Sequence, residues 1–341
     1  MKKLRKILFP FSLLYGEIVG LRNKAFEKGI LTSTTFSIPT IVVGNLNVGG
    51  TGKSPQIEYL IRLLIENYKV AVLSRGYKRK LKGFQLADEK STADQIGDEP
   101  LQFYKKFKNI IVAVDADRTN GIGQLQKLKS PPNIILLDDA FQHRKVDGGF
   151  NILLTTYGDL YVDDYILPAG NLREKREGAK RAKIIIVTKC PKNLTENEQF
   201  KITQKLKVEL NQTVYFSTII YADKIVGLKD EINVSKLDEY EVLLVTGIAN
   251  SNPLTKFLES KSINFKHLKF PDHHNFSKSD KEKIIQDFEK LNVDKRIILT
   301  TEKDYVRSFS SEENQFYYLP IQTEFIDNEK DFNKQVLNYV R

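Results

Sequence analysis

A glycine-rich turn that ends in lysine and serine carries the clearest chemistry in this sequence. It reads Asn47-Val48-Gly49-Gly50-Thr51-Gly52-Lys53-Ser54. In such a turn the backbone N–H groups point at phosphate oxygens, and the positive end of the following helix favours an anion. Lys53 can then reach the β- and γ-phosphates of a nucleotide, and Ser54 can ligate Mg²⁺. The turn predicts a site for a nucleoside triphosphate.

The match to the usual pattern is incomplete, because Asn47 stands where the first glycine is expected. A glycine turn between a strand and a helix can also be purely structural. The flanking segments favour phosphate binding, since residues 37–43 are typical of a strand and residues 56–67 carry apolar side chains at helical spacing. Those side chains are Ile57, Leu60, Ile61, Leu64 and Ile65.

Acidic residues end a second predicted strand. The apolar run of residues 134–137 leads directly into Asp138 and Asp139. Nucleotide-binding sheets supply the carboxylate that holds Mg²⁺ from such a position. The pair is therefore a candidate for the metal, and Gln142 belongs to the same predicted sheet edge.

Basic and aromatic side chains stand at other loops where an anionic substrate could bind. They are Arg75, Tyr77, Arg118 and Arg173. The first two follow a predicted strand at residues 69–74, and the carboxyl ends of strands are where open α/β sheets bind ligands. For the outer lysines of the same loop, at residues 78–82, a solvated loop is the alternative.

Two further motifs contain residues able to move a proton. Asp98 and Glu99 stand just before a predicted helix at residues 101–107, where an acid serves as helix N-cap, general base or metal-linked carboxylate. His273 and His274 are adjacent, so their side chains diverge, and no spaced third ligand for zinc is evident. A histidine that orients or titrates with a carboxylate is the favoured interpretation, and a structural loop histidine is the alternative.

The N-terminus is basic and then apolar. Four of the first six residues are Lys or Arg, and residues 7–15 are mostly apolar. A membrane-spanning helix needs about 20 apolar residues, so this run is too short. A signal peptide and a helix packed on the protein are alternatives. A helix lying on an anionic bilayer fits best.

Composition narrows the protein class. The chain has 341 residues, of which 41% are hydrophobic and 28% charged, as in ordinary globular proteins. A single cysteine, Cys190, excludes a disulfide within the chain. The net charge of +10 favours an anionic partner. No module that reads nucleic acid is recognisable, and no obligate protein partner is evident.

Alternating strands and helices predict an α/β protein with a mostly parallel sheet between helix layers, of the P-loop NTPase type. A second, smaller α/β/α unit follows. We expect a membrane-contacting helix at residues 1–30, a P-loop nucleotide-binding unit at 31–212, an extended linker at 213–222 and the smaller unit at 223–341.

Taken in order, the motifs resemble those of the tetraacyldisaccharide 4′-kinase family. They are Val43-Gly44-Asn45, the glycine turn with Pro55, Arg75-Gly76-Tyr77, Gly97-Asp98-Glu99-Pro100, Asp138-Asp139, Phe141-Gln142-His143-Arg144, Leu167-Pro168-Ala169-Gly170, Thr246-Gly247-Ile248-Ala249, Phe270-Pro271-Asp272-His273-His274 and Thr301-Glu302-Lys303-Asp304. The resemblance runs from about residue 40 to about residue 307, and the basic N-terminal helix also fits.

The resemblance implies transfer of the γ-phosphate of ATP, with Mg²⁺, to the 4′-hydroxyl of an acylated glucosamine disaccharide 1-phosphate lipid. It implies work at the cytoplasmic face of the inner membrane, by peripheral or N-terminal attachment. Asp98 matches the base and His273 its helper. Asp138 and Asp139 match the metal-linked acids, with Asp139 also assigned to catalysis.

Three positions depart from the family pattern. They are Ser54 in place of Thr, Ala140 in place of Gly and Lys78 in place of Gly. The last two put the sugar contacts in doubt. A membrane-associated regulatory ATPase without a lipid acceptor is the rival reading, but such proteins often carry lysine where Val48 stands.

Overall fold

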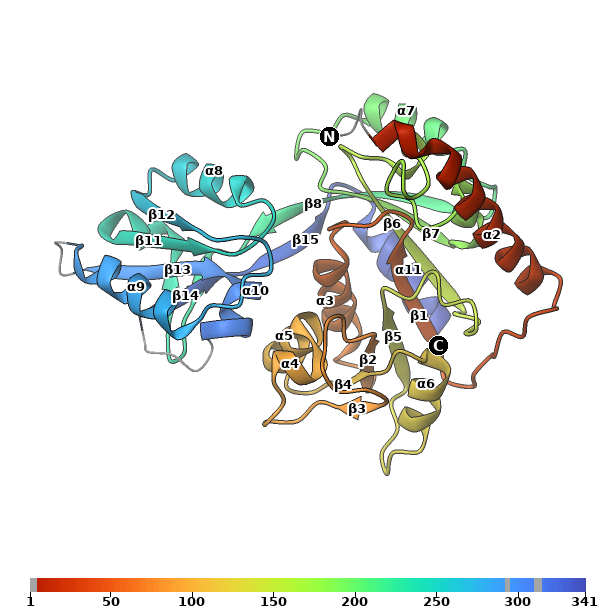
Figure 1. The fold of residues 1–341 in the computed structure, drawn as a ribbon, viewed down its shortest axis with the longest axis horizontal. Helices are drawn as coiled ribbons and strands as arrows, with labels where there is room; N and C mark the ends of the chain where they lie inside the picture. The colour runs from red at the N-terminus through yellow and green to blue at the C-terminus, as the bar shows by residue number, and fades with distance from the viewer. Residues whose placement is uncertain (1–4, 292–294, 310–314) are drawn as a thin grey trace.

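The chain folds around two separate β-sheets (Figure 1). A computed structural model describes residues 5–291, 295–309 and 315–341. Residues 1–4, part of the predicted basic N-terminus, lie outside the described residues. Both sheets are mostly parallel, which confirms the fold class expected from the sequence.

The larger sheet has nine strands in the order β15-β8-β7-β6-β1-β5-β2-β4-β3. Their bounds are β1 Thr40–Asn45, β2 Val70–Ser74, β3 Gln85–Leu86, β4 Ile111–Val114, β5 Ile134–Asp138, β6 Phe150–Thr156, β7 Ile184–Thr188, β8 Thr213–Tyr221 and β15 Ile321–Phe325. Only the edge strands β3 and β15 pair antiparallel with their neighbours. The seven parallel strands therefore end at one common edge, where their polar residues gather.

Helices cover both faces of the larger sheet, because its parallel strands are apolar on both sides. On one face lie α3 (Lys53–Leu64), α5 (Asp98–Lys106) and α11 (Glu329–Val340). On the other lie α6 (Arg118–Gln126) and α7 (Glu196–Leu206). The short α4 (Ala93–Ile96) precedes α5.

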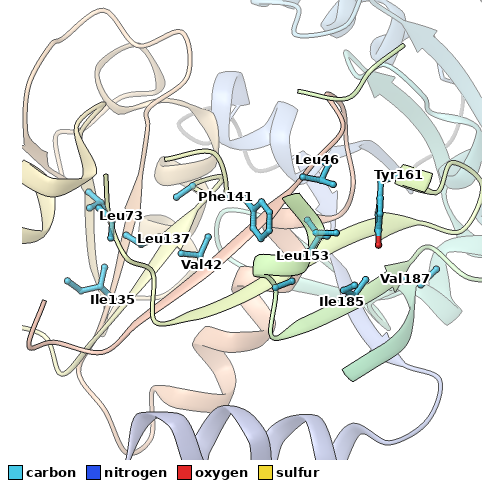
Figure 2. Close-up of a cluster of buried hydrophobic side chains, with 14 of the residues drawn as sticks. Val42, Leu46, Leu73, Ile135, Leu137, Phe141, Leu153, Tyr161, Ile185 and Val187 are labelled. Atoms are coloured by element: carbon cyan, nitrogen blue, oxygen red, sulfur yellow. The ribbon is translucent and has the colours of Figure 1, made fainter. Parts of the chain in front are cut away.

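Figure 2 shows part of the second face, where Phe141 lies among Val42, Leu46 and Leu153. This packing fixes the chain beyond β5 against β1. A Cβ added at Gly44 would lie 2.6 Å from the Phe141 Cβ, so β1 requires glycine there. The absence of a side chain at Gly44 thereby lets the backbone at Phe141 approach β1 closely.

The smaller sheet has six strands in the order β10-β9-β14-β13-β11-β12. Their bounds are β9 Lys224–Val226, β10 Glu231–Asn233, β11 Glu241–Thr246, β12 Phe265–Lys269, β13 Arg296–Thr301 and β14 Phe316–Leu319. The helices are α8 (Asn252–Ser260) on one face and α9 (Lys278–Glu289) on the other, with α10 (Glu302–Asp304) and the π-helical turn η5 (Tyr305–Phe309) after β13.

The end of the chain returns to the larger sheet, which differs from the expected unit at 223–341. Strand β15 pairs with β8, and α11 packs beside α3. Phe325, Phe332 and Val336 enter the core of the larger sheet. Since these apolar residues are buried there, the smaller sheet ends with β14, and β8 and β15 both run between the two sheets (Figure 1).

The predicted N-terminal helix is present as α2 (Phe9–Glu27), after a short 3₁₀ turn, η1, at Lys6–Leu8. It lies along the outside of the larger sheet's lobe (Figure 1). No helix in the described part of the chain is both long and apolar enough to cross a membrane.

Candidate active site

The glycine turn adopts the strand–turn–helix geometry predicted from the sequence. It connects β1 to α3, and Gly52 caps α3 with φ at +86°, a left-handed conformation that favours glycine. Gly49 has φ at +120°. Lys53 and Ser54 are the first two residues of α3, so their side chains stand where a bound phosphate meets the helix N-terminus.

Other residues of the turn are held by neighbouring loops. Asn47 is buried and donates to Asp164 at 3.0 Å, whereas Val48 is exposed. Lys189 donates to the Gly50 carbonyl at 2.6 Å, and Thr188 to the Thr51 carbonyl at 2.8 Å. These bonds hold the turn from its outer side, so its shape does not depend on the glycines alone.

Asp139 stands between two cations at the edge of the larger sheet. Lys53 Nζ lies 3.7 Å from its Oδ1. Arg173 binds both carboxylate oxygens, at 2.7 and 3.2 Å, and also donates to the Asn45 carbonyl at 2.9 Å. Burial alone would raise the pKa of Asp139, but Lys53 and Arg173 hold that pKa below its ordinary value. Asp139 is therefore a carboxylate, and it connects the glycine turn to the loop that carries Arg173.

Asp138, the last residue of β5, is more deeply buried than Asp139. Its Oδ2 accepts a hydrogen bond from Ser74 at 3.1 Å. Burial, and then the charges of Asp139 and Glu99, raise its pKa to about 6. The pairing of Val43 with Asp138 in the β1–β5 register brings this carboxylate beside the start of the glycine turn.

Arg118 has a different environment from the one we expected for a substrate-binding residue. Its side chain is only 2% exposed. It donates to the carbonyls of Asp115 at 2.7 Å and Asp138 at 2.9 Å. Burial lowers its pKa to about 10. Through these hydrogen bonds Arg118 connects the ends of β4 and β5.

Gln142 also turns inward. Its Nε2 donates to the Asn45 carbonyl and to Glu174 Oε1, both at 2.9 Å. Glu174 is buried and accepts from Arg181 as well, at 2.8 Å. By contrast, Arg75 and Tyr77 are exposed at the end of β2. Of these candidates, Arg75 and Tyr77 present the accessible side chains.

Asp98 faces the smaller sheet, and its chief partner is Arg307. Arg307 donates to Asp98 Oδ2 from Nε at 2.8 Å and from Nη2 at 2.6 Å. His273 Nδ1 lies 3.7 Å from the same oxygen and 3.5 Å from Arg307 Nη2. The structure therefore brings Asp98 and His273 together, as the family resemblance implied. Asp98 is not the helix N-cap, because Gly97 occupies that position.

Sequence reasoning missed Arg307, although a signal was present. The motif Thr301-Glu302-Lys303-Asp304 is part of the family resemblance, and Arg307 lies three residues beyond it. Asp304 is fully buried and accepts from the Gly247 N–H at 2.9 Å and from the Thr301 hydroxyl at 2.7 Å. It also contacts Arg307 at 3.4 Å. A buried acid at this position orients the arginine on the next turn.

Two more ion pairs join α5 to the smaller sheet. Lys303 donates to Glu99 at 2.8 Å. Lys106 lies 2.8 Å from both Glu302 and Glu58, two buried carboxylates. Burial, and then the nearby Glu58, raise the pKa of Glu302 to about 7. Together with Asp98 and Arg307, these pairs form a charged seam along α5.

The two adjacent histidines have separate surroundings. His273 has φ at +56°, and its N–H donates to the Gly247 carbonyl at 3.0 Å. His274 instead lies 3.0 Å from Asp280, in the first turn of α9, and stacks on Phe270. Within the described residues no group of three His, Cys, Asp or Glu is placed to hold a metal. Of the two histidines, His273 is the one beside Asp98.

Comparison with known proteins shows the family of this chain. The family model described as tetraacyldisaccharide-1-P 4'-kinase matches residues 4–341. The chain belongs to the tetraacyldisaccharide-1-P 4'-kinase family. The match includes the smaller sheet and nearly all of the N-terminal segment, so it is wider than the stretch of about residues 40–307 on which the resemblance rested.

Relatives in this kinase family are similar over their whole lengths. The tetraacyldisaccharide 4'-kinase of Flavobacterium johnsoniae is 54% identical, with 100% of this chain and 98% of that protein covered. That of Bacteroides fragilis is 47% identical, with 99% and 94% covered. The crystal structure of LpxK from Aquifex aeolicus in complex with ATP has a TM-score of 0.80 and 31% identity, covering 99% of this chain and 100% of that one.

Proposed function

We propose that this chain transfers the γ-phosphate of ATP to the 4′-hydroxyl of a tetraacyldisaccharide 1-phosphate, a step in lipid A biosynthesis. Family membership carries the reaction class, and the similarity to the ATP-bound Aquifex structure supports ATP as the donor. The structural observation that supports this transfer is the position of Asp98, which lies beside His273 and Arg307.

The glycine turn is the proposed seat of the ATP phosphates. Backbone N–H groups of residues 47–54 would bind phosphate oxygens, except that of Val48, which donates to the Asn171 carbonyl. Lys53 would contact the β- and γ-phosphates. Thr51 Oγ1 is buried, and no hydrogen-bond partner for it lies among the described residues. A phosphate oxygen is the kind of acceptor that this hydroxyl needs.

Ser54 and Asp138 are the residues that would hold Mg²⁺. Asp138 is a buried carboxyl whose pKa rises to about 6 beside a second acid, and a divalent cation offsets such crowding of negative charge. Mg²⁺ takes one or two protein oxygens together with phosphates and water, so this small donor set is sufficient. When bound, Mg²⁺ neutralises charge on the β- and γ-phosphate oxygens.

Asp98 is the proposed general base. Both Arg307 hydrogen bonds go to Oδ2, so we assign Oδ1 to accept the 4′-hydroxyl proton as the hydroxyl oxygen attacks the γ-phosphorus. The bond between the γ-phosphorus and the β–γ bridging oxygen breaks in the same step, and ADP leaves. His273 assists from the smaller sheet, which we propose closes over the acceptor. Asp139 keeps Lys53 and Arg173 aligned while charge develops on the phosphoryl group.

The acceptor would bind beside Asp98, at the edge of the larger sheet where its parallel strands end. The exposed Arg75 and Tyr77 are the candidates for contact with the sugar phosphate, and Arg173 is a candidate for the transferred phosphate. Gln142 and Arg118 support this edge through contacts with the backbone. The sugar contacts are thus assigned to the residues that solvent can reach.

An anionic bilayer is the proposed partner of α2, at the cytoplasmic face of the inner membrane. Phe11, Leu14, Ile18 and Leu21 are each more than half exposed on this helix, and Arg22 and Lys24 follow them. Apolar side chains flanked by cations are what an interfacial helix presents to anionic lipid. The proposed attachment is peripheral.

The deciding experiment supplies γ-labelled ATP, Mg²⁺ and the disaccharide 1-phosphate lipid in detergent. We expect label at the 4′ position, with little release of inorganic phosphate when the lipid is omitted. Rapid hydrolysis without acceptor, and no labelled lipid, would instead support the regulatory ATPase. Asp98→Ala should bind ATP normally and fail to label the lipid.

A further inference from the structure

We propose that α2 is a positioning element of the active site, which transmits contact with a lipid surface to the loop at residues 166–175. We call this segment the 166–175 loop, and it carries Arg173. The proposal rests on the proposed membrane contact of α2 and goes beyond it. It assigns to the helix a second task, that of ordering catalytic groups.

Four hydrogen bonds join α2 to the 166–175 loop, and one of them is the exposed pair in which Lys175 donates to Glu17 at 2.6 Å. The Tyr15 hydroxyl donates to the Arg173 carbonyl at 3.1 Å. Asn23 Nδ2 donates to Glu174 Oε2 at 2.8 Å, and the Ala169 N–H donates to the Ser12 hydroxyl at 2.8 Å. Residues 12, 15 and 23 fall on one side of a helix, so α2 faces the loop along its length.

The opposite side of the 166–175 loop is hydrogen-bonded to the glycine turn. The Arg173 N–H donates to the Leu46 carbonyl at 2.8 Å, and the Val48 N–H donates to the Asn171 carbonyl at 2.8 Å. The Arg173 guanidinium holds Asp139. The loop is thus a single layer between α2 and the groups that would bind ATP.

The face of α2 that points away from the loop is apolar and exposed. Phe11, Leu14, Ile18 and Leu21 are 64%, 63%, 59% and 65% exposed. Their spacing of three and four residues places them together along the helix. A bilayer that takes up this face would hold the helix still, and the opposite face would pass that restraint to Arg173.

Glu174 connects α2 to a second residue beside the glycine turn, Gln142. It receives Asn23 on one oxygen and Gln142 on the other, and Gln142 in turn binds the Asn45 carbonyl. Removing Asn23 would leave a buried carboxylate with one partner fewer. Tyr15 and Asn23 are therefore positioning residues, which act on the reaction through Arg173 and Glu174.

The test measures amide hydrogen exchange in the 166–175 loop of the full chain. The probe is a vesicle of phosphatidylethanolamine with phosphatidylglycerol, compared with buffer and with phosphatidylcholine vesicles. The wild type should bind the anionic vesicles and exchange the loop amides about five- to twentyfold more slowly, the effect of one or two hydrogen bonds. Tyr15→Phe with Asn23→Leu should still bind the vesicles without that slowing.

The matched control changes the other face of the helix. Leu14→Glu with Ile18→Glu should lose vesicle binding and keep wild-type loop exchange in buffer. With lipid substrate in detergent, the control should raise KM for the lipid, whereas Tyr15→Phe with Asn23→Leu should lower kcat about five- to twentyfold. Melting temperatures identify any variant that has simply lost stability.

The outcomes separate the two proposals. Failure of the wild type to bind anionic vesicles would overturn the membrane contact. Vesicle binding with unchanged loop exchange, or equal slowing in the Tyr15→Phe with Asn23→Leu variant, would overturn the coupling while the membrane contact stands.

Discussion

Arg307 donates two hydrogen bonds to a single carboxylate oxygen of Asp98, although the two residues are 209 positions apart in the chain. Asp98 opens α5 beside the larger sheet, and Arg307 lies in η5 beside the smaller one. The proposed base is therefore oriented by a residue that belongs to the other sheet. Any displacement of the smaller sheet would change how the base is held.

Replacing Asp98 by Asn should remove the proton acceptor and leave the phosphate site intact. We expect kcat to fall about 10²- to 10⁴-fold, the usual contribution of a general base, with little change in ATP affinity. Single-turnover transfer and equilibrium ATP binding measure the two quantities. Near-normal turnover would show that another group takes the proton.

Arg307→Gln should misplace Asp98 without touching the nucleotide. The loss of charge-assisted hydrogen bonds worth about 1.5–3 kcal/mol predicts a kcat about 10- to 150-fold lower, with KM for ATP unchanged. The matched control is Lys303→Gln, which breaks the neighbouring pair with Glu99 and spares Asp98. Equal losses of kcat in the two variants would mean that the ion pairs between α5 and the smaller sheet act together, and that Arg307 has no separate effect through Asp98.

Arg118→Met should destabilise the protein and leave substrate affinity unchanged in the folded fraction. The change leaves the carbonyls of Asp115 and Asp138 unpaired in a buried place. We expect the free energy of unfolding to fall by about 2–4 kcal/mol. Denaturant titration and KM for the lipid check this, and the exposed Arg75→Met should show the reverse, with normal stability and a raised KM for the lipid. Normal stability with lost lipid affinity would restore Arg118 to the substrate site.

Glu302 gives the fold a dependence on pH. Its pKa is raised from 4.5 to about 7 by burial and by Glu58, so the folded state binds the proton more tightly than the unfolded chain. That stabilisation is full below about pH 4.5 and is lost as the pH rises through about 7. Between about pH 5 and about pH 8, the melting temperature of the wild type should fall relative to that of Glu302→Gln. The exposed Glu89→Gln should track the wild type, and parallel curves for Glu302→Gln would contradict the assignment.

Chelation of Mg²⁺ should stop transfer, and added Mg²⁺ should restore it. Ser54→Ala should raise the Mg²⁺ concentration needed for half-maximal rate. Loss of a residue that only supports a metal ligand typically weakens metal binding about 10- to 100-fold, and loss of a ligand should cost at least as much. ATP binding without Mg²⁺ should change little in this variant. An unchanged Mg²⁺ requirement would remove Ser54 from the metal site.

Local pattern was sufficient for the parts of the site that lie within one strand–turn–helix unit. The turn before Lys53 and the acid at the end of β5 follow from periodicity and from the chemistry of phosphate, and both lie where the sequence predicted. The closeness of Asp98 and His273 came from a resemblance to a family, since no local rule joins residues so distant in sequence.

The remainder depends on tertiary packing. The sequence around Arg118 does not reveal that its guanidinium is buried and donates to two backbone carbonyls. Nor does local pattern show that Phe332 is buried against α3, so the return of the chain to the larger sheet was missed. Arg307 was missed for the same reason, because its partner lies on the other sheet.

The paired strands β8 and β15 have a mechanical consequence. Five residue pairs, from Tyr221 with Ile321 to Ser217 with Phe325, join them into a ribbon that carries the whole smaller sheet. Bending this ribbon within its own plane would stretch its hydrogen bonds, whereas flexing it across its flat face leaves them intact. The smaller sheet should consequently rotate about one axis, set by the direction in which the ribbon bends. It would then approach Asp98 from the same direction at every turnover.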